Sequence, residues 1–256
     1  MTTPTSERPS ANTQEINRPW PKALLFAWLA AVALLVLVWL LPVQTGMVRT
    51  AILLCAALSW AGALALFRSR RVVTAPLVAI AGLVVAVAVL PGSPPDEAAL
   101  RDGYVSTLRA YAGAPYVWGG ETHRGIDCSG LVRCALAQAS FEQGVRAHNP
   151  RLLRQGFALW WTDASASAMQ DGAGGKARRL FESAALNDIP AGRLEPGDFA
   201  VTRSGSHTLA YLGDNNWIAA DPLARRVVTY HAPEPREPYF KAPMVLLRWN
   251  ALEDAE

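Results

Sequence analysis

The chain has 256 residues, enough for one or two domains, and 51% of them are hydrophobic, a high share for a wholly soluble protein. Its formal net charge of +3 is modest and gives no indication of nucleic-acid binding. Three cysteines cannot form a disulfide framework, and the four histidines are scattered without the paired spacing of metal ligands, so neither a metal nor another cofactor is expected.

The hydrophobic excess lies in the first third of the chain. Residues 1–19 are polar and rich in Thr, Ser, Asn and Pro, which predicts a disordered cytoplasmic tail. Residues 23–43, 50–67 and 72–90 have no charged side chain, and each stretch is close to the length that crosses a bilayer as a helix. The first is longer than the apolar core of a cleaved signal peptide, and buried core helices are the remaining alternative. We therefore predict a three-span transmembrane region over residues 20–92.

Positive charges in the short flanking segments predict the orientation, because they are retained on the cytoplasmic side. Three basic residues precede the first stretch and three lie between the second and third: Arg8, Arg18, Lys22, Arg68, Arg70 and Arg71. The loop between the first and second stretches has only Arg49. We expect a multi-pass protein of the inner (cytoplasmic) membrane, with everything after Pro91 facing the periplasm or the exterior.

Residues 93–256 are predicted to form one soluble α+β domain. Asp96 is placed to cap a helix with apolar side chains at helical spacing, and a second amphipathic helix begins near residue 128. Short strand-like runs follow at 199–201, 208–212, 217–221, 226–230 and 245–249. Helices followed by an antiparallel meander are typical of the α+β class.

Cys128 is a candidate nucleophile because it lies in the first turn of the second predicted helix. A cysteine attacks as the thiolate, and the N–H groups and dipole of a helix N-terminus lower a thiol pKa that is about 8.5 when unperturbed. Its small neighbours Ser129 and Gly130 leave room for a substrate, and its own N–H is placed to bind the oxyanion of a tetrahedral intermediate. Taken alone, a cysteine at a helix start is more often a packing residue.

His207 is the candidate general base. It opens a strand-like run after a loop rich in glycine and serine, a suitable place to present an imidazole to a helix end. The histidines at 123, 148 and 231 lie in polar, loop-like surroundings. A lone histidine is more often a surface or core residue, so the hypothesis depends on the combination of cysteine and histidine.

The motifs around these two residues resemble the NlpC-type, papain-like family of cell-wall cysteine peptidases. The resemblance rests on Tyr-Val-Trp-Gly-Gly at 116–120, Asp-Cys-Ser-Gly-Leu-Val at 127–132, Pro-Gly-Asp at 196–198 and the run 207–213. It covers about residues 104–230. It implies a nucleophile helix packed on an antiparallel sheet, in a domain that hydrolyses amide bonds of bacterial peptidoglycan stem peptides through a thioester.

The resemblance also implies roles for individual residues. Cys128 matches the nucleophile, His207 the base, and Tyr116 a tyrosine whose hydroxyl faces the active site. Asp127 and Ser129 match residues that help to bind the peptide substrate, often its free amine. The alternative for Tyr116 and Asp127 is structural, as a turn-packing aromatic ring and a helix cap.

One departure from the family concerns the third catalytic residue. The family usually has a polar residue, commonly histidine, twelve positions after the base, where it orients the imidazole. Here that position is Ala219. Asp221 lies two residues further along the same strand face, and it either replaces the missing group or is a turn residue before Pro222.

A second departure is the long separation between Cys128 and His207. It predicts an insertion within residues 141–193, with a helix near 151–161, that covers or narrows the groove.

Two alternative functions remain: acyl transfer or hydrolysis on lipids with the same fold, and non-catalytic binding of wall peptides. The expected partners are the peptidoglycan peptide and the membrane, and the sequence leaves protein partners open.

Overall fold

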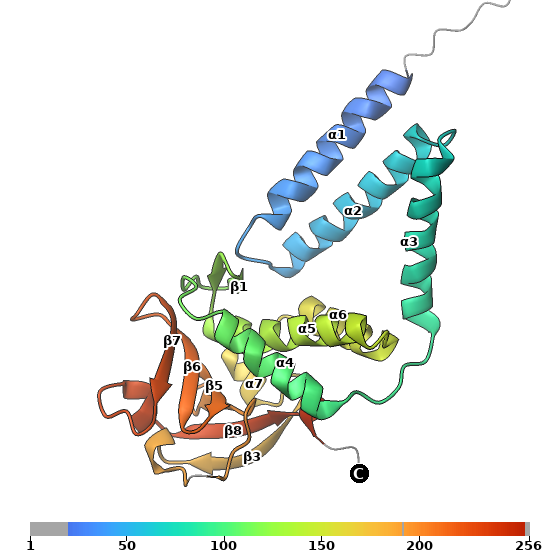
Figure 1. Cartoon of the computed structure of the whole chain (residues 1–256). Coiled ribbons are helices and arrows are strands. Elements are labelled where there is room, and N and C mark those ends of the chain that lie inside the picture. The colour runs from blue at the N-terminus through green and yellow to red at the C-terminus, as the bar shows by residue number, and fades with distance from the viewer. Residues whose placement is uncertain (1–19, 191, 254–256) are drawn as a thin grey trace, which may run out of the picture.

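The structure is a computed structural model that describes residues 20–190 and 192–253, so the predicted tail at 1–19 lies outside the described residues. Three long helices extend from a globular α+β part (Figure 1). The helices α1 (Trp20–Trp39) and α2 (Gly46–Leu66) pack as an antiparallel pair, and α3 (Arg71–Val89) runs back to the globular part on its own. All three are long and apolar enough to cross a membrane.

The first long helix is shorter than its apolar stretch predicts. It ends at Trp39 rather than at residue 43, because Pro42 has no N–H and disfavours a helical conformation in the residue before it. The loop that follows pairs with the globular part. Val43 forms an isolated bridge with Gly120, and the Pro42 carbonyl accepts a hydrogen bond from the Glu121 N–H at 3.0 Å. The loop between α1 and α2 is therefore packed against the globular part.

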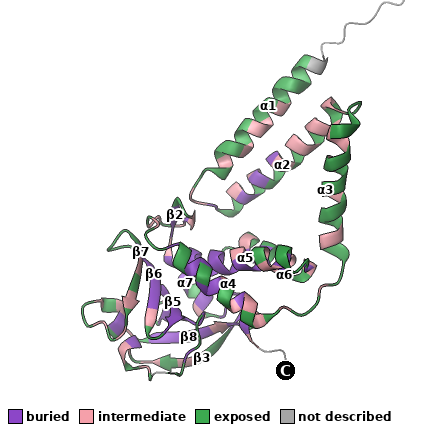
Figure 2. Cartoon of the chain, in the orientation of Figure 1, coloured by how far each residue is buried: buried purple, intermediate pink, exposed green. Residues whose placement is uncertain are grey.

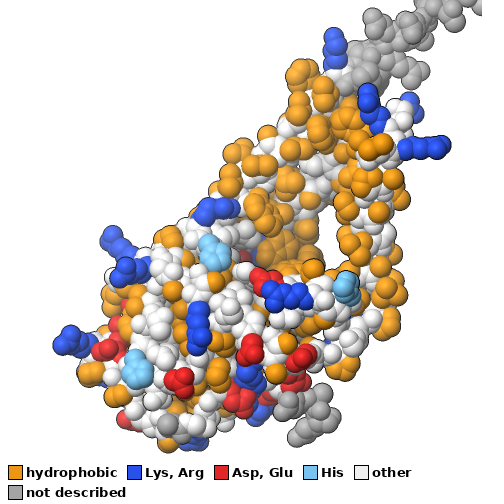
Figure 3. All heavy atoms as spheres, viewed as in Figure 1, with side chains coloured by type: hydrophobic (Ala, Val, Ile, Leu, Met, Phe, Trp, Pro, Cys, Tyr) orange, Lys and Arg blue, Asp and Glu red, His pale blue; other side chains and the backbone are white. Residues whose placement is uncertain are grey.

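The arginines that flank the long helices are either buried or exposed. Arg49 is not the loop charge that the sequence suggested, because it lies in the first turn of α2 and is fully buried. The turn between α2 and α3 carries exposed Arg68, Arg70 and Arg71. Figure 3 shows basic side chains gathered at this end of the helices, away from the globular part. These arginines thus lie at the end of the helices that is distant from the globular part, and the orientation expected from them stays a prediction.

The globular part begins with α4 (Glu97–Ala110), which Asp96 caps as expected. The elements that follow are β1 (Glu121–Thr122), β2 (Gly125–Ile126), α5 (Cys128–Arg146), α6 (Pro150–Trp161), α7 (Ala166–Gln170), β3 (Ala177–Ser183), η1 (Leu186–Asp188), β4 (Phe199–Thr202), β5 (Thr208–Gly213), β6 (Asn216–Asp221), β7 (Arg226–His231), η2 (Pro238–Lys241), β8 (Met244–Trp249) and η3 (Asn250–Leu252). The five predicted strands are confirmed to within a residue at either end. The α+β class is confirmed as well.

The strands β3 to β8 form one antiparallel sheet in the order β3-β8-β4-β5-β6-β7. One face, which includes Phe199, Ala210 and Ile218, packs on the helices and forms the larger core. The opposite face, which includes Leu209 and Trp217, packs against the segments around η1 and η2. Figure 2 shows that the buried residues concentrate in α5 and the central strands, whereas the three long helices are largely exposed.

The stretch 141–193 is only partly separate from the main fold. Its first residues complete α5, and β3 is an edge strand of the sheet that pairs with β8 from Ala177↔Trp249 to Ser183↔Met244. The predicted helix near 151–161 is present as α6. The short helix α7 lies beside the turn before His207, where the Gln170 side-chain amide donates to the Arg203 carbonyl at 3.1 Å.

A buried carboxylate joins the long helices to the globular part. Glu121 in β1 accepts hydrogen bonds from Arg49 in α2 and from Arg133 in α5, and the three side chains are at most 5% exposed. Burial raises the pKa of Glu121, and the two guanidinium groups oppose that shift. The arginines also donate to the carbonyls of Trp161 and Leu159, at 3.1 and 2.7 Å.

We predict that Glu121→Gln lowers the free energy of unfolding by about 3–5 kcal/mol, because it leaves two buried guanidinium groups without a counter-charge. The measurement is thermal or denaturant unfolding of the full chain in detergent. Glu182→Gln is the matched control, since Glu182 forms an exposed ion pair with Arg203 at 3.8 Å and its loss is expected to be nearly neutral. Equal stability of the two variants would contradict the role given to Glu121.

Candidate active site

The side chain of Asp127 caps the N-terminus of α5. Asp127 adopts an extended conformation, and its Oδ1 atom accepts hydrogen bonds from the Gly130 N–H at 2.6 Å and the Ser129 hydroxyl at 3.1 Å. Its Oδ2 atom accepts from the Gly119 N–H at 2.9 Å. Asp127 is therefore a helix cap, which was the structural alternative to a substrate-binding role. It accepts a hydrogen bond from a helix N–H that has no intrahelical acceptor.

A close approach of backbone segments holds the cap in place. A Cβ atom added at Gly130 would lie 2.5 Å from the Gly120 carbonyl oxygen, so only glycine fits there without a shift of the backbone. The Gly120 carbonyl also accepts the Asp127 N–H at 3.0 Å. The glycines of both sequence motifs thus meet directly beneath the first turn of α5.

Cys128 is the first residue of α5, and it is 8% exposed. Burial raises the pKa of its thiol, and the Asp127 carboxylate adds to the increase. Hydrogen bonds from the backbone and hydroxyl of Thr208 and from the backbone of Ser129 lower the pKa in part. The net change in pKa is opposite to the lowering expected at a helix N-terminus, because burial outweighs these hydrogen bonds, so the thiol is mostly protonated before a substrate binds.

His207 immediately precedes β5 and is 2% exposed. Its ring stacks on Tyr239 of η2, with centroids 3.9 Å apart and an interplanar angle of 17°. Burial lowers the pKa of His207 to about 4, and the nearby Asp221 carboxylate opposes this shift. The imidazole is neutral at physiological pH, the state that a general base requires. Its buried Nε2 atom has no hydrogen-bond partner within the described part of the chain.

Asp221 lies at the end of β6, on the strand next to His207. The pairing of β5 with β6 joins Ala210 to Ile218 and Tyr211 to Trp217, and continuing this register brings Asp221 opposite His207. Its oxygens are engaged elsewhere: Oδ1 accepts from the Leu223 N–H at 2.6 Å and Oδ2 accepts from the Tyr230 hydroxyl. Asp221 thus combines features of both interpretations, a turn residue and a charge facing the imidazole.

The remaining predicted residues surround the thiol. Burial raises the pKa of Tyr116 to about 12, with further increases from the nearby Cys128 and Asp127. A small cavity of about 60 Å³ adjoins Asp127 and Ser129, and Glu121 and Asp163 add carboxylates to its wall. The structure thus brings all six predicted site residues to one region, in which Asp127 and Ser129 face the α1–α2 loop.

Sequence reasoning missed Thr208 and Tyr239. Thr208 follows His207 directly, but its contact with the Cys128 sulfur depends on how α5 meets the sheet. Tyr239 lies in η2, far along the chain, and burial together with the nearby Asp221 carboxylate raises its pKa. No local pattern identifies either residue, because both contacts arise between distant segments.

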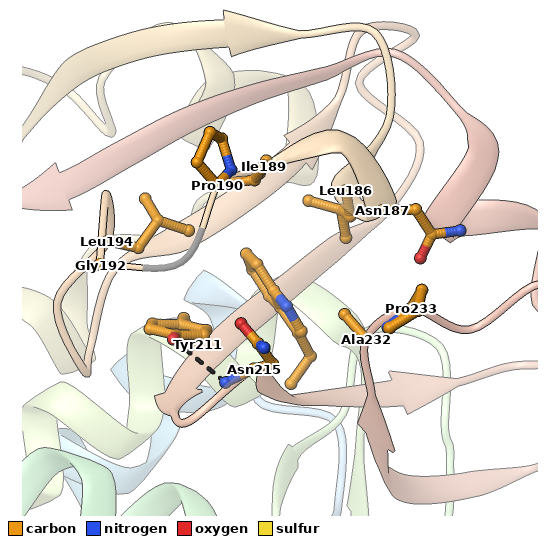
Figure 4. Close-up of a pocket in the computed structure, with 11 residues that line it drawn as sticks. Leu186, Asn187, Ile189, Pro190, Gly192, Leu194, Tyr211, Asn215, Ala232 and Pro233 are labelled. Atoms are coloured by element: carbon orange, nitrogen blue, oxygen red, sulfur yellow. Dashed lines mark hydrogen bonds between the residues drawn. The ribbon is translucent and has the colours of Figure 1, made fainter.

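A second hollow lies apart from these residues, between the η1 segment and the β5–β6 turn (Figure 4). Its volume is about 80 Å³, and its lining includes Tyr211, whose hydroxyl accepts a hydrogen bond from the Asn215 N–H at 3.2 Å. None of the predicted site residues lines it. We therefore assign the candidate site to the region around Cys128.

The low pKa of His207 predicts a pH-dependent stability. At a pH below the ordinary pKa of histidine, His207 binds a proton in the unfolded chain. In the folded chain the buried imidazole does not bind this proton until the pH approaches 4. Lowering the pH from about 7 to about 5 is therefore expected to cost about 2 kcal/mol of stability through this group.

The test compares unfolding at the two pH values for the native chain and His207→Gln. The pH dependence should shrink in His207→Gln and persist in His231→Gln, which alters an exposed histidine. The same pH dependence in all three chains would show that His207 is not buried in its neutral form.

The NlpC/P60 family matches residues 113–248. A curated relative, Dipeptidyl-peptidase 6 of Lysinibacillus sphaericus, is 48% identical over 146 residues, which are 57% of this chain and 41% of that protein. The chain thus spans less than half the length of this relative.

Two solved structures are also similar, at low identity. The peptidoglycan hydrolase RipB of Mycobacterium tuberculosis is 19% identical, with 78% of this chain and 88% of that chain covered and a TM-score of 0.39. The P60 domain of an antigen of M. avium subspecies paratuberculosis is 19% identical, with 62% and 98% covered and a TM-score of 0.36.

Proposed function

The chain belongs to the NlpC/P60 family, and from this premise we propose that residues 93–256 form a cysteine peptidase that hydrolyses amide bonds in peptidoglycan stem peptides. The observation that carries the proposal is the position of Cys128 at the start of α5, against the segment that contains His207 and Thr208. Acyl transfer requires a thiol, a base and a donor for the oxyanion, and these are present together as the buried Cys128 thiol, the neutral His207 imidazole and the Cys128 N–H at the start of α5.

The proposed reaction begins with the uncharged pair. As Cys128 attacks the amide carbonyl carbon, His207 accepts the thiol proton, and the carbonyl oxygen becomes an oxyanion. The Cys128 N–H, which has no intrahelical acceptor, stabilises this charge together with the Tyr116 hydroxyl. His207 then gives its proton to the leaving amine as the C–N bond breaks. A thioester remains on Cys128.

Water completes the cycle. His207 takes a proton from water as the oxygen attacks the thioester, and the sulfur leaves and regains the proton as the free carboxylic acid forms. Asp127 and Ser129 are proposed to bind the free amine of the peptide, which the carboxylates around the adjoining cavity favour. No metal is required for any of these steps.

We propose that the three long helices cross the inner membrane, with the arginine-rich turn inside and the globular part outside. The separation of charge along the helices supports this orientation. It places a peptidase on the side of the membrane where the cell wall lies.

We predict that Cys128→Ala abolishes the release of new amines from purified peptidoglycan, a loss of about a thousandfold or more. The assay uses the full chain in lipid nanodiscs, with the products identified by mass. Cys134→Ala is the matched control, because it removes another buried thiol of α5 and is expected to keep most of the activity. Equal activity of native chain and Cys128→Ala, or no release by the native chain, would reject the proposal.

Asp221 is proposed to position His207 and to raise its pKa. We predict that Asp221→Asn lowers kcat by about tenfold or more with little change in KM, and moves the acidic limb of the kcat profile to lower pH. Asp214→Asn, in the exposed β5–β6 turn, is the control and should change neither. A loss of thermal stability with an unchanged pH profile would assign Asp221 to the turn alone.

A further inference from the structure

The helix α6 has apolar side chains on two faces. Leu152, Gly156 and Leu159 are buried, and α6 packs along α5. Phe157 and Trp161 are each 44% exposed although they are large and apolar, and they are four residues apart, so they share one face of the helix. An amphipathic helix at a protein surface normally presents polar residues on the face away from the core.

Three side chains of α6 form an aromatic cluster, in which Phe157 and Trp161 are exposed and Trp160 is half-buried. The rings of Phe157 and Trp161 are stacked with centroids 6.2 Å apart, and Trp160 lies 5.6 Å from Phe157 and 6.2 Å from Trp161. Tryptophan is enriched where proteins meet the interface between membrane and water. The composition of the cluster therefore suits the boundary of a bilayer.

The aromatic cluster lies close to the ends of the long helices, where a membrane-interface surface is expected. Near its C-terminal end, α6 is joined to the start of α2, because the Trp161 carbonyl accepts from Arg49 at 3.1 Å and the Trp160 indole N–H donates to Gln44 at 3.1 Å. In its middle, Arg154 donates to the carbonyls of Val87 and Leu90 at the end of α3, at 2.6 and 2.7 Å. Figure 1 shows α6 lying across the globular ends of α2 and α3.

A hollow whose lining mixes aromatic side chains with charged ones such as Arg124 and Glu142 continues from Trp160 toward α1. It has a volume of about 410 Å³, and Trp39, Phe141 and Trp160 contribute to its lining. Trp39 is the last residue of α1 and is 56% exposed. Aromatic side chains thus lie at the level where the long helices meet the globular part, beside both α1 and α2.

We propose that the aromatic cluster of α6 is a bilayer-contact surface that rests on the outer leaflet. The partner is phospholipid, because a surface fixed by hydrogen bonds at the ends of α2 and α3 is level with the lipid that surrounds them. The inference depends on the proposed membrane anchoring and not on the peptidase activity. With that activity, the contact holds Cys128 at the bilayer surface, since α6 is bound to α5 through the Leu159 carbonyl and Arg133.

The test uses the unmodified full chain in nanodiscs that contain a phospholipid with a photoactivatable diazirine in its acyl chain. After illumination, labelled positions are mapped by peptide mass spectrometry. We expect label in α6 around Phe157 and Trp161, and label in α3 around Leu83, which is 64% exposed. The control is Leu223 in the β6–β7 turn, which is 72% exposed and should stay unlabelled.

The other outcomes are distinguishable. Label in α3 without label in α6 would overturn the bilayer-contact surface and leave the membrane anchoring intact. Absence of label from α3 would overturn the anchoring and the contact surface together. Neither result depends on peptidoglycan hydrolysis, so the peptidase proposal is tested separately.

Discussion

The buried carboxylate of Glu121 is the interaction on which the arrangement of the molecule depends. It pairs with Arg49 of α2 and Arg133 of α5, so α2, the β1–β2 hairpin and α5 meet at one charge. Without it, two guanidinium groups would be buried with no compensation, which proteins tolerate poorly. As a result, Cys128 is fixed relative to the ends of the long helices and is not carried on a flexible linker.

Burial of the two candidate catalytic side chains determines their protonation states. Burial raises the pKa of Cys128 and lowers that of His207, so the pair is uncharged before substrate binds. In the proposed reaction, proton transfer therefore accompanies attack on the carbonyl, and no preformed thiolate is exposed. A protonated, buried thiol resists oxidation better than a thiolate, which would suit a cysteine outside the cytoplasm, where the proposed orientation places Cys128. The stacked Tyr239 and the opposing Asp221 limit the orientations of the imidazole.

Local patterns in the sequence predict most of the elements and identify Cys128 as a candidate nucleophile, but they do not predict the contacts between distant segments. The strands and the start of α5 at Cys128 follow from alternation, spacing and the Asp127 cap. The contact of Tyr239 with His207 and the burial of Arg49 arise only when separate segments pack together. The sequence does not predict β3 within the stretch 141–193, because β3 is a partly exposed edge strand with little apolar alternation.

The central claim is that Cys128 and His207 act as one unit. Its most direct test is the kcat of Cys128→Ala, His207→Ala and the double variant on one soluble peptidoglycan fragment. If the two residues share each step, either single substitution should cost about as much as both together. Losses that multiply in the double variant would mean that the residues act independently, and would contradict the account.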